Sequence, residues 1–210
     1  YSTAQNGNQI SLSIAGNSDI ISTGATSTHK IYSTGIINGN AMTISKSAST
    51  LTVTLDTSNP NAATLTDTTA ADMFAIKLTA GASENVKLTK LNITYDGLEN
   101  NFDKASIKLT IGAKTYTYPT VTFNNNIFTL DVPVSDTITI DNAGVVATVN
   151  GKRTSTATSG QQFFFRISGD GDAMGTGVNS GLPVLSAGVV AGNKFTIDAL
   201  NTTIKGYLNV

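Results

Sequence analysis

Two aspartates in a glycine-rich segment are the residues whose type and spacing come nearest to a metal site. Asp170 and Asp172 lie two residues apart within the sequence Ser168-Gly-Asp-Gly-Asp-Ala-Met-Gly-Thr-Gly177. Carboxylates in a loop, completed by backbone carbonyls, are the hard oxygen ligands that Ca²⁺ takes in proteins. The segment lacks the spacing and the distal glutamate of an EF-hand loop. We therefore interpret it as a surface loop, keep a calcium site as the alternative, and predict no other cofactor.

Two tyrosines form the second candidate site. Tyr116 and Tyr118 are two residues apart, so on a strand their rings would lie on one face. Such rings stack on the apolar face of a sugar, but they also serve as cross-strand packing in a sheet. We predict packing and keep carbohydrate binding as the alternative.

Side chains for catalysis are scarce. The chain has no Cys, no Trp and a single histidine, His29, and its only glutamates are Glu84 and Glu99. A Cys nucleophile, a zinc cluster, and any triad or metal site that needs two imidazoles therefore cannot be assembled. Glycoside hydrolysis needs two carboxyl groups facing each other across a cleft, and both glutamates fall in predicted loops. We predict that the protein is not an enzyme.

The composition excludes further classes of partner. Charged residues make up 13% of the 210 residues and the net charge is −1, so there is no basic surface for nucleic acid. No run of 18 apolar residues is present, so no membrane span is predicted. Neutral polar residues replace the charge, with 33 Thr, 19 Ser and 20 Asn. This surface is typical of secreted wall and filament proteins, and we predict an extracellular location.

The elements that must position these residues are strands. Apolar residues alternate with polar ones in more than ten short segments, and Gly, Asn and Asp separate them. The step from Leu88 to Leu91 breaks the two-residue period and predicts a β-bulge in one continuous strand. The pair Asn150-Gly151 predicts a type I′ hairpin. We predict an all-β fold, an immunoglobulin-like or jelly-roll β-sandwich with an extended N-terminal strand arm.

The N-terminal arm is the most informative feature for function. Ile10, Leu12 and Ile14 alternate on one short strand, and a flexible joint at residues 16–19 follows. We predict two parts, a donor-strand arm at residues 1–20 and a β-sandwich domain at residues 21–210. A lone strand cannot bury its apolar side by itself, so it must pair with a sheet edge of its own chain or of a neighbouring copy. Insertion into a neighbour would be donor-strand complementation, with these three side chains filling pockets of the acceptor.

A weak internal repeat accompanies the arm. Asn6-Gly-Asn8 precedes Ile10, and Asn38-Gly-Asn40 precedes Met42 at the same spacing. In a chain this rich in Ser, Thr and Asn, we attribute the repeat to chance.

The middle of the chain has a recurring order of strands: an alternating strand and Pro turn at 50–60, an apolar strand ending in Thr-Ala-Gly81, and the Glu84-x-Val-x-Leu-x-x-Leu91 strand. In this order it resembles β-sandwich modules of prokaryotic surface-layer and extracellular filament subunits, including donor-strand, pilus-like ones. Residues 136–141 and 161–168 are similar to the closing strands of such modules. The resemblance covers about residues 50–170, and it implies a scaffold or filament role in place of catalysis.

From these observations we predict a structural subunit of an extracellular filament or pilus-like appendage. Its partners would be copies of itself in a helical homopolymer, held by the donated strand with Ile10, Leu12 and Ile14. The alternative is a surface-layer or adhesin module that binds carbohydrate through Tyr116 and Tyr118, with calcium at Asp170 and Asp172. Asn92 and Asn201 match the Asn-x-Thr pattern of N-glycosylation and are predicted acceptors if the source glycosylates exported proteins.

Overall fold

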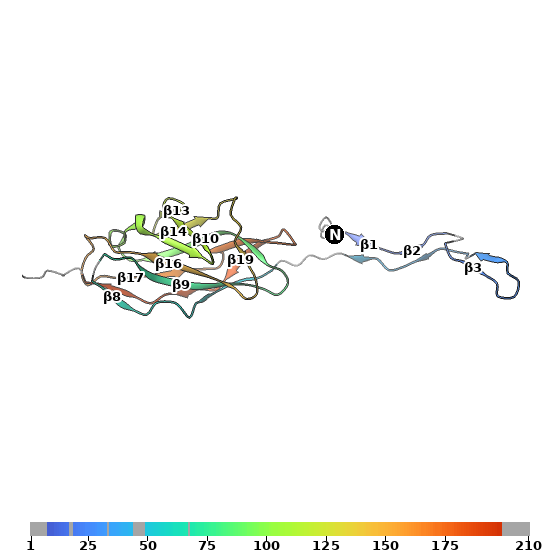
Figure 1. Ribbon diagram of the computed structural model, residues 1–210, viewed down its shortest axis with the longest axis horizontal. Helices are drawn as coiled ribbons and strands as arrows, with labels where there is room; N and C mark the ends of the chain where they lie inside the picture. Colours follow the sequence, from blue (N-terminus) through green and yellow to red (C-terminus); the bar gives the residue numbers. More distant parts are fainter. Residues whose placement is uncertain (1–7, 17–18, 33, 44–48, 67, 199–210) are drawn as a thin grey trace, which may run out of the picture. The chain divides into compact units, whose positions relative to one another are not determined.

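The structure is a computed structural model that describes residues 8–16, 19–32, 34–43, 49–66 and 68–198. The chain forms two compact units, Tyr1–Ser47 and Ala48–Val210. Among the described residues the regular elements are β-strands and two short 3₁₀ turns (Figure 1). The predicted all-β class is confirmed. The unit boundary lies at residue 47, whereas the sequence analysis placed the end of the arm at residue 20.

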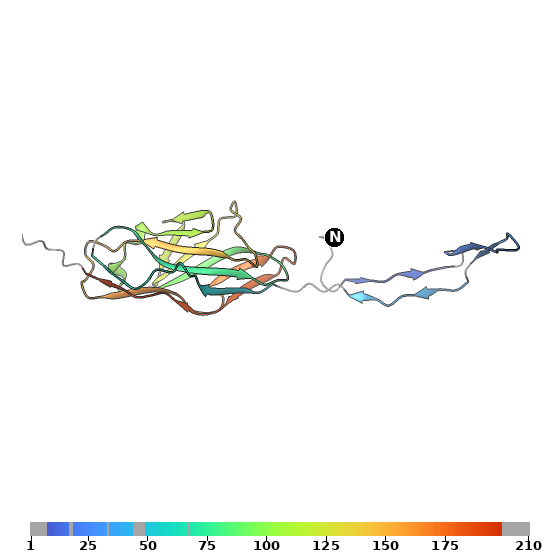
Figure 2. The ribbon, with the colours of Figure 1, turned by 60° about the horizontal axis from the view of Figure 1, so that its bottom comes forward.

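The first unit is a two-stranded antiparallel ribbon (Figure 2). Its strand pairs, from the open end to the turn, are β1 (Gln9–Ile10) with β6 (Met42–Thr43), β2 (Ser13–Ile14) with β5 (Ile37–Asn38), and β3 (Ile21–Thr23) with β4 (Lys30–Tyr32). The turn is closed by the backbone, since the Gly24 N–H donates to the His29 carbonyl at 2.9 Å. The predicted donor strand is therefore one half of a hairpin whose other half is residues 37–43.

The second unit is a β-sandwich (Figure 1). Its strands are β7 (Leu51–Leu55), β8 (Ala63–Leu65), β9 (Ala71–Ala80), β10 (Val86–Asp96), β11 (Lys108–Ile111), β12 (Lys114–Thr117), β13 (Val121–Asn124), β14 (Ile127–Asp131), β15 (Thr139–Ile140), β16 (Val145–Gly151), β17 (Gln162–Ile167), β18 (Ala173–Gly177), β19 (Pro183–Ala187), β20 (Val190–Ala191) and β21 (Phe195–Ile197). Two 3₁₀ turns, η1 (Glu99–Asn101) and η2 (Lys104–Ser106), follow β10.

Two layers of strands face each other in this unit. One layer has the order β12-β11-β16-β9-β7, and the other contains β10 with β14, β15, β17 and β18 beside it. Strand β19 pairs antiparallel with β18 and parallel with β7, so it joins the layers. Strand β8 pairs parallel with β21. The layers meet through their aromatic residues: the rings of Phe74 on β9 and Phe165 on β17 stack with centroids 6.4 Å apart.

Strand β10 shows how the sequence pattern becomes packing. Val86 and Leu88 are buried, and after a change of phase Leu91, Ile93 and Tyr95 are buried. The register with β18 shifts between Leu88 and Lys90, so the predicted bulge is confirmed. The extra residue lets one long strand keep its apolar side chains on the core face in both halves.

The predicted turn at Asn150-Gly151 is wrong. Both residues belong to β16, where Asn150 lies opposite Asp72 of β9. Glycine is needed here for space, because a Cβ on Gly151 would collide with the ring of Phe102. The two-residue turn with positive φ at both positions occurs instead at residues 125–126, between β13 and β14, where φ is 48° and 61°.

The centre of the sandwich is a group of rings around Tyr95. This fully buried ring lies 5.5–6.4 Å, centroid to centroid, from the rings of four phenylalanines, Phe102, Phe123, Phe163 and Phe165. Its hydroxyl donates to the Leu98 carbonyl at 3.2 Å. Burial raises the pKa of this phenol well above its ordinary value of 10.0. Tyr95 is thus a core residue whose polar group is satisfied.

Candidate functional site

The N-terminal ribbon exposes an unusual amount of apolar surface. Nine large apolar residues in this unit have relative exposures between 49% and 77%. They are Ile10, Leu12, Ile20, Ile21, Ile31, Tyr32, Ile36, Ile37 and Met42. A soluble surface carries single exposed apolar residues routinely, but nine within one short ribbon form a patch of the kind that marks a contact site.

The register of the ribbon brings these residues together in cross-strand pairs. The directly opposed apolar pairs are Ile10 with Met42, Ile14 with Ile37, and Ile21 with Tyr32. Directly opposed residues share one face of a sheet and contact each other. A two-stranded sheet has no second layer, so neither of its faces is covered from within. The ribbon therefore presents apolar pairs that its own fold leaves exposed.

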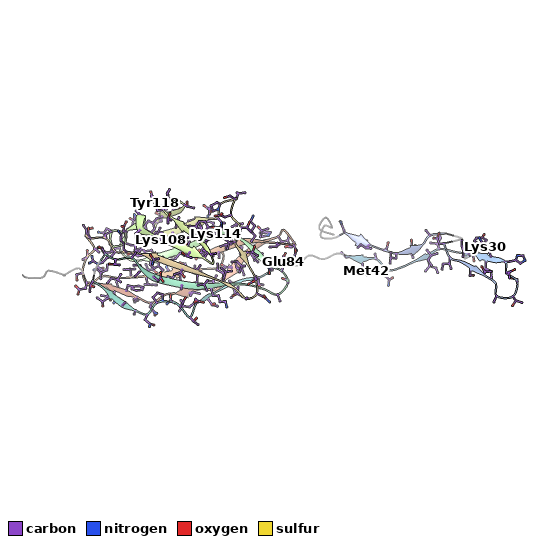
Figure 3. All side chains as sticks on the ribbon, in the orientation of Figure 1. Lys30, Met42, Glu84, Lys108, Lys114 and Tyr118 are labelled. Atoms are coloured by element: carbon purple, nitrogen blue, oxygen red, sulfur yellow. The ribbon has the colours of Figure 1, made fainter. Side chains whose placement is uncertain are left out.

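Charge does little to solvate this patch. Among the described residues of the ribbon, the formally charged side chains are Asp19 and Lys30. The Asp19 carboxylate is occupied by the local turn, since its Oδ2 accepts the N–H groups of Ala15 at 2.8 Å and Gly16 at 3.1 Å. Figure 3 labels Lys30, in β4 beside the turn of the ribbon, and Met42, in β6 at its open end. An isolated two-stranded ribbon is only marginally stable in water. A partner that covers its apolar residues would therefore stabilise this ribbon.

The predicted donor residues lie in this ribbon, and one expectation about them is corrected. Ile10 and Ile14 are not on a lone strand, because Met42 and Ile37 pair with them in the same chain. The reason is that residues 37–43 form a complementary extended segment which the sequence analysis assigned to the sandwich. The apolar side chains nevertheless stay accessible, with Leu12 77% exposed.

Asp170 and Asp172 lie in the loop between β17 and β18, where both carboxylates accept backbone N–H groups. Asp172 Oδ2 accepts from Ser168 at 2.7 Å and Gly169 at 3.1 Å. Asp170 Oδ1 accepts from Gly188 at 3.0 Å. Among the residues that the structure describes, no group of three or more His, Cys, Asp or Glu side chains is placed to hold a metal ion. The two aspartates act here as loop-capping groups.

Tyr116 and Tyr118 have different environments. Tyr116 on β12 is buried, and its hydroxyl donates to Asp136 Oδ2 at 3.0 Å. Tyr118 follows the strand and is 54% exposed on the outside of the sandwich (Figure 3). The structure therefore offers one exposed ring here in place of the two-ring platform that the carbohydrate alternative requires.

Asp136 joins Tyr116 to Lys114 in a small polar network. Lys114 Nζ donates to Asp136 Oδ1 at 3.1 Å. The hydrogen bonds from Lys114 and then from Tyr116 lower the pKa of the Asp136 carboxyl below its ordinary value. Burial, together with the hydrogen bond to Asp136, raises the pKa of the Tyr116 phenol to about 12.

The network predicts a pH dependence of stability. Because the pKa of Asp136 is lower in the folded state, its contribution is present above the unfolded pKa of about 4 and is lost as the pH falls through the folded pKa. Asp136→Asn should lower the free energy of unfolding at pH 6. Between pH 5 and pH 2, the free energy of unfolding should fall less in this variant than in the native chain. Urea unfolding at a series of pH values measures this. Asp131→Asn, at an exposed carboxylate 3.6 Å from Lys90, is the control, and identical pH profiles for the two variants would contradict the assignment.

The two glutamates are also engaged in the sandwich. Glu84 is buried before β10, and its Oε2 accepts the N–H groups of Asn179 at 2.7 Å and Ser180 at 2.8 Å. Glu99 in η1 pairs with Lys104 of η2. These contacts fix a turn and the η1–η2 segment, respectively.

The structure describes one of the two predicted glycosylation acceptors. Asn92 lies in β10, and its Oδ1 accepts a hydrogen bond from the Thr129 hydroxyl at 3.0 Å. Asn201 lies outside the described residues. Modification of either residue stays a prediction.

Comparison with known proteins gives a fold likeness without a family. No family model matches the chain, and no curated protein matches it. Solved structures that it resembles include the seventh ScaB type I cohesin from Pseudobacteroides cellulosolvens, at 14% identity and a TM-score of 0.36, covering 76% of this chain and 99% of the cohesin. BslA, a bacterial hydrophobin, matches at 14% identity and a TM-score of 0.28, covering 68% and 93%. The collagen adhesin from S. aureus matches at 12% identity and a TM-score of 0.24, covering 76% and 57%.

These likenesses are too distant to carry an argument about function. The described residues also contain no helix that is long and apolar enough to cross a membrane.

Proposed function

We propose that this chain is a non-enzymatic structural subunit of an extracellular, pilus-like homopolymer, in which the N-terminal ribbon of one copy is covered by the next copy. The single observation that carries the proposal is the set of nine exposed large apolar residues on a two-stranded ribbon. The donated element is a hairpin, so Ile10, Leu12 and Ile14 act together with residues of the returning strand.

A second copy is the occupant that the charge of the chain favours. The net charge is −1 over 210 residues, so copies do not repel one another strongly. The ribbon also has outer edges with unpaired backbone groups, which can extend a sheet of another molecule. Because the ribbon and the surface that receives it are different, the contact is heterologous and propagates into a fibre unless it closes into a ring.

The size of the patch is adequate for such a contact. Fully burying a large apolar side chain contributes about 1.5–3 kcal/mol. Covering the exposed half of nine such side chains therefore contributes about 7–13 kcal/mol. Association costs about 4–15 kcal/mol in lost freedom. The two figures are similar, so the attraction supplied by the ribbon roughly offsets the cost of association. Contacts between sandwich units then set the final affinity.

Charge substitutions on the ribbon test the proposal. Leu12→Lys combined with Ile37→Lys should abolish filaments at concentrations where the native chain forms them, because each ammonium would be placed against apolar surface of the next copy. Negative-stain electron microscopy and sedimentation velocity measure the outcome. Val134→Lys is the matched control, since Val134 lies on the sandwich and is 97% exposed.

The control should assemble like the native chain. Filaments of normal length and yield from the double variant would overturn the ribbon's role. A native chain that stays monomeric at millimolar concentration would overturn the polymer itself.

A further inference from the structure

One end of the sandwich holds a buried arginine without an acidic partner among the described residues. Arg153 follows β16 and is only 6% exposed. Its Nη1 donates to the Thr154 carbonyl at 3.1 Å and its Nη2 to the Thr66 carbonyl at 2.7 Å. Its Nε is buried and has no hydrogen-bond acceptor among the described residues. The ion pairs formed by the described residues do not include Arg153.

A second buried donor lies on the adjoining segment. Asn101 is fully buried, its Oδ1 accepts the Thr158 N–H at 2.9 Å, and its Nδ2 has no acceptor in the part of the chain that the structure describes. The two segments are held side by side, since Phe102 and Arg153 form a β-bridge and the Thr154 N–H donates to the Asn101 carbonyl at 3.0 Å. Both unsatisfied groups are donors. Buried donors of this kind call for an acceptor-rich species.

A pocket opens beside Arg153, and Asn101 is not among the residues that line it. It has a volume of about 310 Å³, and its lining residues are Thr68, Asp103, Lys152, Arg153, Thr154 and Ser155. Lys152 Nζ lies 3.5 Å from Asp103 Oδ2, so Asp103, the one carboxylate among the described residues of the lining, is paired. Asp103 Oδ1 also accepts the Ala105 N–H at 3.2 Å. With Lys152 and Asp103 offsetting each other, the charge of Arg153 leaves the described residues of the lining with one net positive charge.

We propose that this pocket, which we call the Arg153 pocket, binds a small tetrahedral oxyanion, phosphate or sulfate. The guanidinium offers a planar set of N–H donors that matches such oxygens, and the partly exposed ammonium of Lys152 adds further N–H donors. The hydroxyl groups of Thr68 and Ser155 complete a lining that can donate to the same ligand. The site lies in the sandwich unit and does not depend on the ribbon's role in assembly.

Titration of the full chain with sodium phosphate and sodium sulfate tests the site. Isothermal titration calorimetry at constant ionic strength, balanced with sodium chloride, should show saturable binding of one anion per chain. The midpoint of thermal unfolding should rise with anion concentration beyond the value in chloride, because a ligand of the folded state stabilises it. Absence of both effects overturns the site.

Substitutions assign the binding to this pocket. Arg153→Gln should weaken it tenfold or more, because the ligand loses a charged donor, and Arg153→Lys should weaken it less. Arg166→Gln is the control, since Arg166 on β17 pairs with Asp96 and does not line the pocket. Lys152→Gln, at a partly exposed residue, provides a second test if Arg153→Gln does not fold, and a several-fold loss is expected.

The experiments must also distinguish a bound anion from a carboxylate of the chain itself that occupies the pocket. Asp67 lies next to Thr66 and Thr68 in the sequence. If Asp67→Asn binds phosphate and the native chain does not, a carboxylate of the chain occupies the pocket and the proposal is overturned. A crystal structure grown in phosphate that shows only a water molecule between Asn101 and Arg153 would overturn it as well. Unchanged binding in a folded Arg153→Gln variant would do the same.

Discussion

A chain that begins at Ala48 is expected to fold and to remain monomeric, while the full chain assembles. Among the described residues, the hydrophobic core lies entirely between Leu51 and Ile197, so a chain that begins at Ala48 keeps all of these core residues. The shortened chain does lose the nine exposed apolar residues that drive the proposed contact. The expected result is complete loss of filaments with little change in the midpoint of thermal unfolding.

Light scattering coupled to size exclusion measures the loss of assembly, and circular dichroism measures the midpoint of thermal unfolding. A synthetic ribbon of residues 1–47 is the complementary reagent, because it should bind the shortened chain and should cap growing filaments of the full chain. If the shortened chain polymerises as well as the full chain, the contact lies on the sandwich and the ribbon is dispensable. A shortened chain that does not fold would show instead that the two units depend on each other.

Phe165→Ala is expected to cost about 3–5 kcal/mol in the free energy of unfolding. Phe165 is fully buried on β17, and its ring lies 5.5–6.4 Å, centroid to centroid, from those of five aromatic residues. These neighbours are Phe74, Tyr95, Phe102, Phe128 and Phe163. Because they come from both layers, the cavity left by the ring cannot close without moving the layers relative to each other.

Phe164→Ala is the matched control for that experiment. Phe164 is the next residue on the same strand, points to the other face and is only partly buried, with Lys194 Nζ 5.9 Å from its ring centroid. Its loss should cost less than about 1.5 kcal/mol. Equilibrium unfolding in urea measures both variants on the chain that begins at Ala48 if that chain folds, and otherwise on the full chain. Equal costs would show that the aromatic group is not the structural centre described above.

The strands of the sandwich could be predicted because each has one buried face. In β7, in β10 on each side of its bulge, and in the second half of β9 the apolar residues alternate with polar ones, and alternation is what a half-buried strand requires. The bulge in β10 could be predicted for the same reason, since the buried residues change phase there. Which strands become neighbours does not follow from alternation, so the parallel pairs β7–β19 and β8–β21 were not predicted.

At Asn150-Gly151 the packing of the core overrides the local preference of the sequence for a turn. Asn-Gly favours a type I′ turn by its own conformational freedom. In the structure the missing side chain of Gly151 makes room for the ring of Phe102, and the strand continues. The approach of Phe102 depends on the whole path of the chain through η1 and η2, and no window of sequence around Gly151 contains that information.

Only one of the two strands of the candidate site was predicted from the sequence. Ile10, Leu12 and Ile14 were found from their spacing, while the returning strand was missed because residues 31–44 were assigned to the sandwich. One signal was present: the repeat of Asn-Gly-Asn before Ile10 and before Met42, which lie directly opposite each other in the ribbon. Arg153 and Asn101 gave no signal, because an arginine and an asparagine are ordinary in a sequence until their burial and partners are known.

The parallel pairing of β8 with β21 has a kinetic consequence. Ala63 lies opposite Phe195, so the first part of the sandwich cannot complete its hydrogen bonds until almost the last described residue has left the ribosome. Pairings between such distant residues close slowly, on the scale of milliseconds to seconds. A polypeptide that stays unfolded for that long can still be threaded through a translocation channel, which suits the extracellular role proposed for this chain.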